Sequence, residues 1–447
     1  MGAGPAGLAL ALALAERGLA VTLVESSRSA HQAVRGEALM PSGLAALKSL
    51  GLSPLPPGVP WRRLSGWSFQ IEGRELFCWP EPAAPEAACT LIDQRALLQA
   101  WRQRALGLPQ LTLLEGLAAV DLLHDPSDVG GSERAGGTGG GGGLGGDGLG
   151  GDKVDGSKLG GNKVSGNKVS GGKVSGGKVS GVRLADGREL SADLVVACDG
   201  RSSLLRQRAG LACTTRTDPQ EVLWFLLDGA GVQPLVEWLG GRFVTVVGSG
   251  AAYAVFERAA GGVQLGLLQP AGKPLTSSSP AGWKARWAAA APSFLAHLLE
   301  GLEDGAVVGP QRLPVPVGCA ERWQRSGLLL LGDAAHPMSP LRAQGLNMAL
   351  RDAQVAARVL LPVLRAGDAA GLDAALQAIG TARHREILAI QALQRREALL
   401  GEVLQQAPAL RRLLAVMPAW GAPLLAQRWA ASQRRLRQGV MTLSPLG

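Results

Sequence analysis

The chain has 447 residues, 46% of them hydrophobic, which is enough for two or three domains with sizeable cores. Its formal net charge is +9, but residues 130–181 hold six of the nine lysines, and much of the remaining surplus is arginine near the C-terminus. Because no basic stripe is interleaved with stacking aromatic residues, the charge excludes a nucleic-acid-binding protein.

The stretch from Met1 to Glu25 predicts a tight turn, a helix and a short buried strand that ends in an acid. Gly2, Gly4 and Gly7 have the spacing of a dinucleotide-binding fingerprint. In that motif the glycines allow the turn, the approach of a pyrophosphate and close packing of helix on sheet. The helix N-terminus adds free N–H groups for the phosphates. Glu25 stands where a carboxylate binds a ribose 2′-hydroxyl, which favours FAD or NAD over NADP.

The strand that should lead into this fingerprint is missing, since only Met1 precedes Gly2. In the usual strand order that strand is central, and without it the neighbouring strands would have unpaired buried backbone groups. We therefore expect a Rossmann-type sheet whose first strand is truncated, and a natural protein that begins several residues upstream with an apolar strand.

Between the fingerprint and residue 129 the sequence predicts elements of two layers. Arg35 follows Glu25 closely enough to contact a phosphate, with an ordinary solvated arginine as the alternative. Ser42 is the expected N-cap of a helix that Gly51 ends. The further expected elements are strands at 64–71, 75–79, 111–114 and 117–122 and a helix at 96–105.

Residues 130–181 interrupt this pattern. They are mostly glycine and end in six pentapeptides of the form G-x-K-[V/L]-x, which cannot bury enough apolar surface to offset the entropy of ordering. We expect a disordered Gly/Lys repeat insert, with a binding role of its lysines as the alternative. Strands at 182–184 and 189–190 then surround a turn, which predicts a hairpin and indicates that the insert lengthens one loop of a sheet.

A second stretch has residues placed where a ligand could bind. A buried strand within 192–198 ends in Asp199 and Gly200, and a helix containing Arg206 begins behind them. Ligands of open α/β sheets bind at such strand ends. The next hundred residues predict a β-rich domain with one helix over it. Its expected strands are 222–227, 243–247, 252–256 and 263–268, and its expected helix is 283–299.

The third stretch begins with four leucines at 328–331, which predict a buried strand ending in Gly332 and Asp333. A loop then passes through His336 and Pro340 to a long helix that opens at Asn347. From there to the end the chain is expected to be helical.

With these stretches in place, the chain resembles the FAD-dependent aromatic hydroxylases related to p-hydroxybenzoate hydroxylase, the group A flavoprotein monooxygenases. That family carries a G-x-G-x-x-G, a central Asp-Gly after a strand and a Gly-Asp near the end of its FAD domain. The resemblance covers about residues 1–365 apart from the insert, and the segment GDAAHPMSPLRAQGLNMALRDA is particularly specific. The matching residues here are Gly2, Gly4, Gly7, Asp199, Gly200, Gly332 and Asp333.

By this resemblance, Asp333 hydrogen-bonds the ribityl chain of FAD and Arg95 contacts the flavin. Asp199 and Arg206 are expected near the pyrophosphate. Ala343 stands where many relatives have glycine, which is acceptable if its φ is negative. The residues expected to contact the cofactor are Gly2, Gly4, Gly7, Glu25, Arg35, Arg95, Asp199, Gly200, Arg206, Gly332, Asp333, Pro340, Gly345, Leu346 and Asn347.

No catalytic side chain is assigned. Free backbone N–H groups of Gly345, Leu346 and Asn347 at a helix start would stabilise negative charge on a reduced flavin. His336 is an acid–base candidate, with simple ordering of its loop as the alternative.

The implied reaction is reduction of FAD by NAD(P)H, capture of O₂ as a flavin hydroperoxide and oxygen transfer to an aromatic, quinol or similar electron-rich small molecule. Three other interpretations remain. A prenyl-type flavin reductase shares the motifs and needs no oxygen. A flavin halogenase would need a W-x-W-x-I-P segment, which is absent. A flavoprotein-like binding protein would have no catalytic activity.

The expected architecture is α/β, a Rossmann-type FAD-binding domain interleaved with a β-rich substrate domain and followed by a helical C-terminus. Five scattered cysteines without metal-ligand spacing indicate no metal site and a cytoplasmic protein. The arginine-rich C-terminus is a candidate for peripheral membrane contact. The expected boundaries are 1–60, 90–129, 182–214 and 318–365 for the FAD-binding domain, 61–89 and 215–317 for the substrate domain, 130–181 for the insert and 366–447 for the C-terminal helices.

Overall fold

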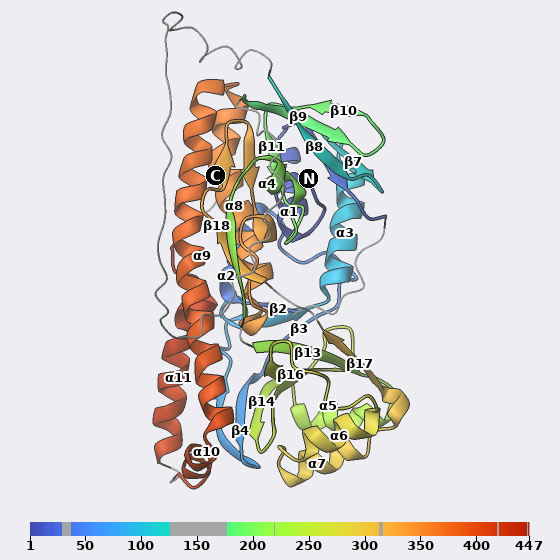
Figure 1. Cartoon of the computed structure of the whole chain (residues 1–447), viewed down its shortest axis with the longest axis vertical. Helices are drawn as coiled ribbons and strands as arrows, with labels where there is room; N and C mark the ends of the chain where they lie inside the picture. The colour runs from blue at the N-terminus through green and yellow to red at the C-terminus, as the bar shows by residue number, and fades with distance from the viewer. Residues whose placement is uncertain are drawn as a thin grey trace, which may run out of the picture.

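The computed structural model describes residues 1–28, 37–125, 177–218, 220–312, 316–417, 420–444 and 446. Figure 1 shows an elongated molecule with an α/β half at one end and a β-rich half at the other. Helices α9 (Ala369–Gln406) and α11 (Gly421–Gln438) run along one side of it. Within the described residues, no helix is long and apolar enough to cross a membrane.

Helix α1 (Pro5–Ala15) forms the centre of the α/β half. It is apolar on every side, and it is therefore buried from Ala6 to its end. It packs against α8 (Gln344–Arg365) and α3 (Gln94–Leu106). The remaining elements of this half are β1 (Val21–Glu25), β2 (Ala38–Leu39), α2 (Pro41–Leu50), β3 (Trp61–Arg63), β6 (Thr90–Ile92), β7 (Leu111–Glu115), β8 (Ala119–His124), β9 (Val179–Leu184), β10 (Glu189–Ser191), β11 (Val195–Ala197), α4 (Leu204–Arg208), β12 (Cys213–Thr217), β18 (Pro316–Ala320), β19 (Gln324–Arg325) and β20 (Leu328–Leu330).

The parallel strands of this half form two short sheets, β1 with β7 and β11 with β20, and the first two residues lie between them. The terminal amino group of Met1 donates to Val196 O at 2.8 Å, and Met1 O accepts from Cys198 N at 2.7 Å. On the other side, Gly2 N donates to Val24 O at 2.7 Å. The turn that carries the glycine fingerprint is therefore held against both sheets.

Strands β9 and β10 form the hairpin predicted after the insert. Strand β9 also pairs with β8, so residues 126–176, which lie outside the described part, connect two neighbouring strands. Residues 179–181, expected in the insert, belong to β9. The expected N-cap at Ser42 is wrong, because α2 begins at Pro41 and its N-cap Met40 gives no side-chain hydrogen bond. A proline at the first helical position has no N–H to cap.

The β-rich half is built on a seven-stranded sheet of order β17-β13-β16-β15-β14-β4-β5. Helices α5 (Gln233–Leu239), α6 (Pro280–Ala288) and α7 (Ser293–Glu300) pack on it and bury Trp283 and Trp287. The strands are β4 (Gly66–Ile71), β5 (Arg74–Pro80), β13 (Gln220–Leu227), β14 (Arg242–Gly248), β15 (Ala251–Glu257), β16 (Val263–Pro270) and β17 (Val307–Arg312).

The single helix expected at 283–299 is two helices. The chain breaks between α6 and α7, where Pro292 is the N-cap of α7, because a proline cannot donate the hydrogen bond that would continue the first helix. Helix α5 was not expected from the sequence.

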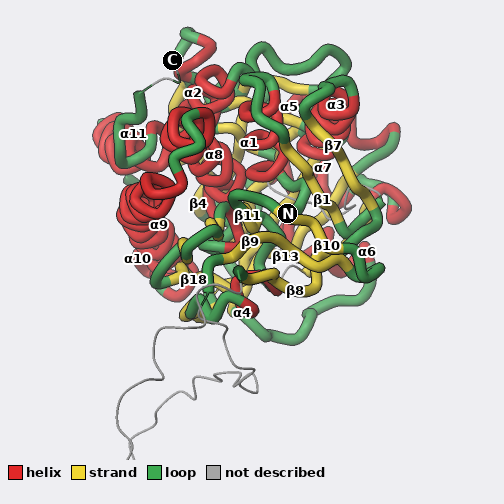
Figure 2. The backbone as a smooth tube through the Cα atoms, turned by 90° about the horizontal axis from the view of Figure 1, so that it is seen from above, coloured by secondary structure: helices red, strands yellow, loops and turns green. Residues whose placement is uncertain are grey.

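The C-terminal part is helical, as expected, and α8 begins at Gln344, three residues before Asn347. Helix α10 (Pro408–Ala415) follows α9, and seen from above α9, α10 and α11 lie together at one edge of the molecule (Figure 2). Short 3₁₀ turns lie at Pro85–Ala87, Ala230–Val232, Asp304–Ala306, Gly332–Ala334 and Leu341–Ala343.

Candidate functional site

The three fingerprint glycines have different surroundings. A Cβ on Gly2, whose φ is +95°, would lie 2.3 Å from Cys198 O, and a Cβ on Gly7 would lie 1.9 Å from Gly2 O. Both positions therefore require glycine to let backbone segments meet. Gly4, in contrast, has no atom within 4 Å of where its Cβ would stand, so the turn is open to a ligand at this point.

Glu25 lies at the end of β1, directly beside this turn. Its carboxylate accepts a hydrogen bond from Ala3 N at 2.6 Å and another from Ser27 N at 2.9 Å. The acid that the sequence predicted as a ribose ligand is thus placed against the fingerprint by the parallel strand that carries it. Arg35, the other residue expected nearby, lies outside the described residues.

The Asp-Gly and Gly-Asp stretches lie side by side because β11 and β20 are paired in parallel and end at the same edge. Arg201 Nε donates to Asp333 Oδ2 at 3.1 Å and joins the two stretches. Arg206 is buried and donates to Ala334 O at 2.6 Å and to Arg201 O at 3.2 Å. Its guanidinium therefore positions the Gly-Asp turn.

Asp199 contributes to the same edge. One carboxylate oxygen accepts from Leu205 N at 3.2 Å, at the start of α4, while Oδ1 is buried without a hydrogen-bond partner in the described part of the chain. The neighbouring Gly200 has φ +86° and open space where a Cβ would stand. An unsatisfied carboxylate oxygen beside open space is suited to a ligand hydroxyl or a water.

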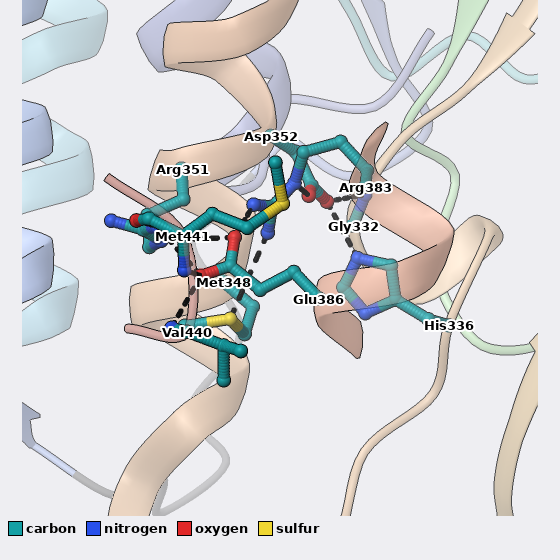
Figure 3. A network of polar contacts seen from close by, with 9 residues as sticks. All are labelled: Gly332, His336, Met348, Arg351, Asp352, Arg383, Glu386, Val440 and Met441. Carbon is teal, nitrogen blue, oxygen red and sulfur yellow. Dashed lines mark hydrogen bonds and ion pairs between the residues drawn. The ribbon is translucent and has the colours of Figure 1, made fainter. Parts of the chain in front are cut away.

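A buried ionic network lies behind the Gly-Asp turn (Figure 3). Asp352 accepts from Gly332 N at 2.9 Å and from Arg383 Nε at 2.6 Å, and its Oδ2 lies 2.5 Å from His336 Nε2. The guanidinium of Arg383 also contacts Glu386. The network thus ties the turn after β20 to helices α8 and α9.

Glu386 extends this network to the C-terminal segment. Arg351 Nη2 donates to Glu386 Oε1 at 2.6 Å and to Met441 O at 2.7 Å, and Val440 N donates to Glu386 Oε1 at 3.0 Å (Figure 3). The segment after α11 is therefore fastened to the same charges that hold the Gly-Asp turn.

Opposite charges decide the ionisation of this cluster. Burial alone would raise the pKa of Asp352, but the charges of His336 and Arg383 and their hydrogen bonds to it hold that pKa below its usual range. Burial lowers the pKa of Arg351 to about 10. His336 is fully buried and stacks on Trp323 with ring centroids 5.0 Å apart. A fully buried, stacked imidazole favours a role for His336 in ordering the loop over a role as a general acid or base.

The loop before α8 has a strained backbone. Arg342 has φ +60° and Ala343 has φ +49°, so the condition of a negative φ at Ala343 is not met. Left-handed conformations cost roughly 1–2 kcal/mol for residues with a Cβ. This geometry turns the chain into α8, whose first-turn N–H groups, at Gly345 and Leu346, have no intrahelical partner.

Asn347 has a role that the sequence did not reveal. Its side chain is buried, accepts from Met40 N at 2.8 Å and donates to Ala38 O at 3.0 Å and Ala343 O at 2.8 Å. It therefore holds the loop before α8 against β2. Arg95 is exposed in the first turn of α3, and Pro340 is the N-cap of the 3₁₀ turn that contains both strained residues.

An aromatic pocket lies next to the same loop. Arg342 stacks over Trp67 and Trp429, 5.7 Å and 5.5 Å from the ring centroids, and its guanidinium also binds Glu397 at 2.7 Å. The cavity left between them is ≈ 10 Å³, about the space of one water, because the side chains fill it. Its lining residues are Met40, Trp67, Arg342, Trp429, Gln433, Leu436 and Arg437.

A larger hollow of ≈ 500 Å³ lies elsewhere, over the first half of α9. It is lined mainly by small or polar side chains, such as Ala378 and Thr381, and none of the lining residues belongs to the three motifs. The aromatic pocket, which touches the loop before α8, is therefore the better candidate for substrate binding.

The open space and the unpaired polar groups of the site can be compared with the groups that FAD would present there. Open space at Gly4, Gly200 and Gly345 leaves room for a ligand to approach the backbone at all three motifs. The free oxygen of Asp199 and the free first-turn N–H groups of α8 match the hydroxyls and the electron-rich ring of a flavin dinucleotide. The residues present therefore fit FAD. Among the described residues, no group of His, Cys, Asp and Glu could hold a metal ion.

Comparison with known proteins also indicates an FAD-binding protein. Residues 1–54 and 166–382 match the family model of the FAD binding domain. A 6-methylpretetramide 4-monooxygenase from Streptomyces rimosus is 31% identical over 82% of this chain and 76% of its own length. A 3-demethoxyubiquinol 3-hydroxylase from Escherichia coli is 24% identical over 83% of this chain and 80% of its own.

A solved structure has a similar fold. The crystal structure of PqsL from Pseudomonas aeruginosa in complex with 2-aminobenzoylacetate has a TM-score of 0.69, with 19% identity, and the match covers 93% of this chain and 96% of that one. At this identity the likeness concerns the fold.

Proposed function

Because the chain belongs to the FAD-dependent aromatic hydroxylases, we propose that NADH or NADPH reduces its flavin and that its substrate binds in the aromatic pocket beside the loop before α8. The protein is an FAD-dependent monooxygenase that acts on aromatic or quinol-type small molecules. When bound, FAD supplies the electron transfer and the oxygen activation.

The position of the aromatic pocket carries the proposal for the substrate. Met40 and Arg342 line it from the α/β half, Trp67 lines it from the sheet, and Trp429 lines it from α11. A planar aromatic ring that replaced the filling side chains would stack on tryptophan faces beside Arg342. It would then lie next to the first turn of α8, where the flavin ring is expected.

We propose the following roles for the residues around FAD. The turn at Gly2–Gly7 and Glu25 hold the dinucleotide, and Asp333 holds the ribityl chain while Arg201 fixes its orientation. The first-turn N–H groups of Gly345 and Leu346 stabilise negative charge on the flavin ring. The closed aromatic pocket excludes water from the reacting atoms.

The proposal for the reductant rests on the family and on the fold. Within the described residues the glycine fingerprint occurs once, at Gly2–Gly7, so NAD(P)H would approach the flavin without a second fold of this kind. We also infer a cytoplasmic location, since the five cysteines are unpaired, as a reducing compartment requires.

The test is consumption of NADH and NADPH by the purified holoprotein, followed with and without oxygen against a panel of phenols, polycyclic aromatics and quinols. We expect one class to accelerate oxidation of the nicotinamide with stoichiometric oxygen uptake and a hydroxylated product. Substrate-dependent oxidation that continues without oxygen would instead identify a reductase.

A variant of the pocket sharpens this test. Trp429→Ala should raise KM for the accepted substrate about five-fold, because the loss of one aromatic stacking partner costs roughly 1 kcal/mol. The matched control is Trp61→Ala, a tryptophan that is 49% exposed on β3. Equal KM values in both variants would place the substrate elsewhere.

A further inference from the structure

Large exposed apolar side chains gather where α9 ends, α10 follows and α11 begins, a region we call the foot. Leu413 is 66% exposed, Val416 69% and Trp420 74%. Figure 1 shows α10 at the end of the molecule that carries the β-rich half. The full set of exposed large apolar residues in the foot is Leu399, Leu400, Val403, Leu413, Val416, Trp420 and Leu424.

The foot is a fixed surface. Arg411 is buried in α10 and contacts Glu72, at the turn between β4 and β5, and it donates to Leu404 O at 2.9 Å. Arg74 Nη1 donates to Ala415 O at 2.8 Å. Because one face of α10 is bound to the sheet in this way, Leu413 on another face of this helix remains directed to solvent.

The charges around the foot are mostly positive. Four exposed arginines lie in the same helices as the apolar residues, and in the described residues from 395 to 428 the acids are Glu397 and Glu402. Glu397 binds Arg342, and Glu402 accepts from Gln406 at 3.0 Å. The exposed arginines are Arg395, Arg396, Arg412 and Arg428.

The exposed apolar side chains and the arginines together indicate what kind of surface binds the foot. A symmetric contact between two copies would bring the four arginines of each copy toward those of the other, and like charges repel. An anionic lipid surface offers both an apolar layer for the leucines, valines and tryptophan and negative headgroups for the arginines. With no spanning helix among the described residues, the contact would be peripheral.

We propose that the foot docks the protein on the surface of an anionic lipid bilayer. Trp420, Leu413 and Val416 enter the headgroup region, and Arg412 and Arg428 contact lipid phosphates. This inference does not depend on the flavin chemistry, because it uses no residue of the cofactor site or of the aromatic pocket.

The test is co-sedimentation of the full-length holoprotein with phosphatidylcholine vesicles that contain or lack phosphatidylglycerol. We expect binding to the anionic vesicles, and weaker binding at high salt because screening reduces the attraction of the arginines. The triple variant Leu413→Ser/Val416→Ser/Trp420→Ser should bind at least about ten-fold more weakly. Arg412→Gln/Arg428→Gln should reduce the preference for phosphatidylglycerol about ten-fold or more.

The matched control is Leu275→Ser/Phe294→Ser/Val308→Ser, which removes apolar residues that are 47%, 59% and 58% exposed in the β-rich half. It should bind vesicles as the wild type does, and all variants should keep their flavin. Equal loss in the control and foot variants would overturn the proposal. So would a wild type that ignores vesicles and forms a dimer that the foot variant abolishes.

Discussion

Asp352 is the residue on which the buried network depends. Its carboxylate bonds Gly332, Arg383 and His336, and none of its side chain is exposed. A buried ion pair contributes little net stability compared with apolar residues, but removing one partner leaves the other charge buried and unpaired. An acid in α8 therefore holds the Gly-Asp turn from behind, while Arg206 binds it through Ala334 O.

We predict that Asp352→Asn lowers the free energy of unfolding by about 3 kcal/mol at neutral pH, because Arg383 loses one of its two buried acids and must share Glu386 with Arg351. The pKa of Asp352 is lowered in the folded state, so its stabilising effect is present above the unfolded pKa and lost as the pH falls through the folded pKa. Denaturant titration should therefore show the difference between wild type and variant shrinking below about pH 4. Asp304→Asn serves as the control and should cost under about 1 kcal/mol, because it removes an acid whose side chain is 60% exposed from its pair with Lys284.

The backbone strain at Ala343 predicts a substitution that increases the stability of the protein. Ala343→Gly should stabilise the protein by about 0.5–1 kcal/mol, because relief of the left-handed strain exceeds the added flexibility of the unfolded chain. Ala366→Gly, at the other end of α8 where φ is −77°, should destabilise slightly. Thermal melting of the two variants checks this, and equal destabilisation would show that the loop is not strained.

Among the secondary-structure elements, the pairing of β8 with β9 shows how short the connection between them, residues 126–176, can be made. Asp125 N donates to Lys178 O at 3.0 Å, so these two residues face each other across the pair. Replacing residues 126–176 by one asparagine leaves Asn-Gly177 as a two-residue turn, a sequence favoured in hairpins.

We predict that this shortened chain folds, keeps its flavin and is more stable by up to roughly 3 kcal/mol, since closing a shorter loop costs less entropy. Flavin content and melting temperature, compared with the full-length protein, measure the outcome. Loss of flavin on shortening would reveal a role for the lysine-rich repeat.

The sequence predicted those elements whose signals are local. The glycine fingerprint, the strand at Val21–Glu25 and the four-leucine strand each carry their own periodicity or turn chemistry. The break between α6 and α7 was missed, although Pro292 was a signal for it.

The contacts that complete the site were beyond sequence reasoning, because they join distant segments. Arg201 and Asp333 are 132 positions apart, and the bond from Arg383 to Asp352 spans 31. Arg201 follows the Asp-Gly motif directly, which was the one hint available. The pairing of Trp67 with Trp429 in the aromatic pocket had no local signal, because it depends on where α11 packs.

At the scale of the whole molecule, the C-terminal helices connect the two halves. Helix α9 supplies Arg383 and Glu386 to the network behind the Gly-Asp turn, and α11 supplies Trp429 to the pocket beside β4. The lower ends of both helices meet at the foot (Figure 1). The cofactor motifs, the aromatic pocket and the foot are thus held by the same pair of helices.

Retention of FAD during purification tests directly whether the three motifs form one cofactor site. We assign Glu25 and Asp333, from different stretches of the chain, to one FAD site. Glu25→Ala and Asp333→Ala should each reduce the FAD that co-purifies through gel filtration about ten-fold, because charge-assisted hydrogen bonds are lost. Asp186→Ala and Glu189→Ala, in the exposed β9–β10 hairpin, should retain it fully. Full flavin content in both site variants would contradict the assignment.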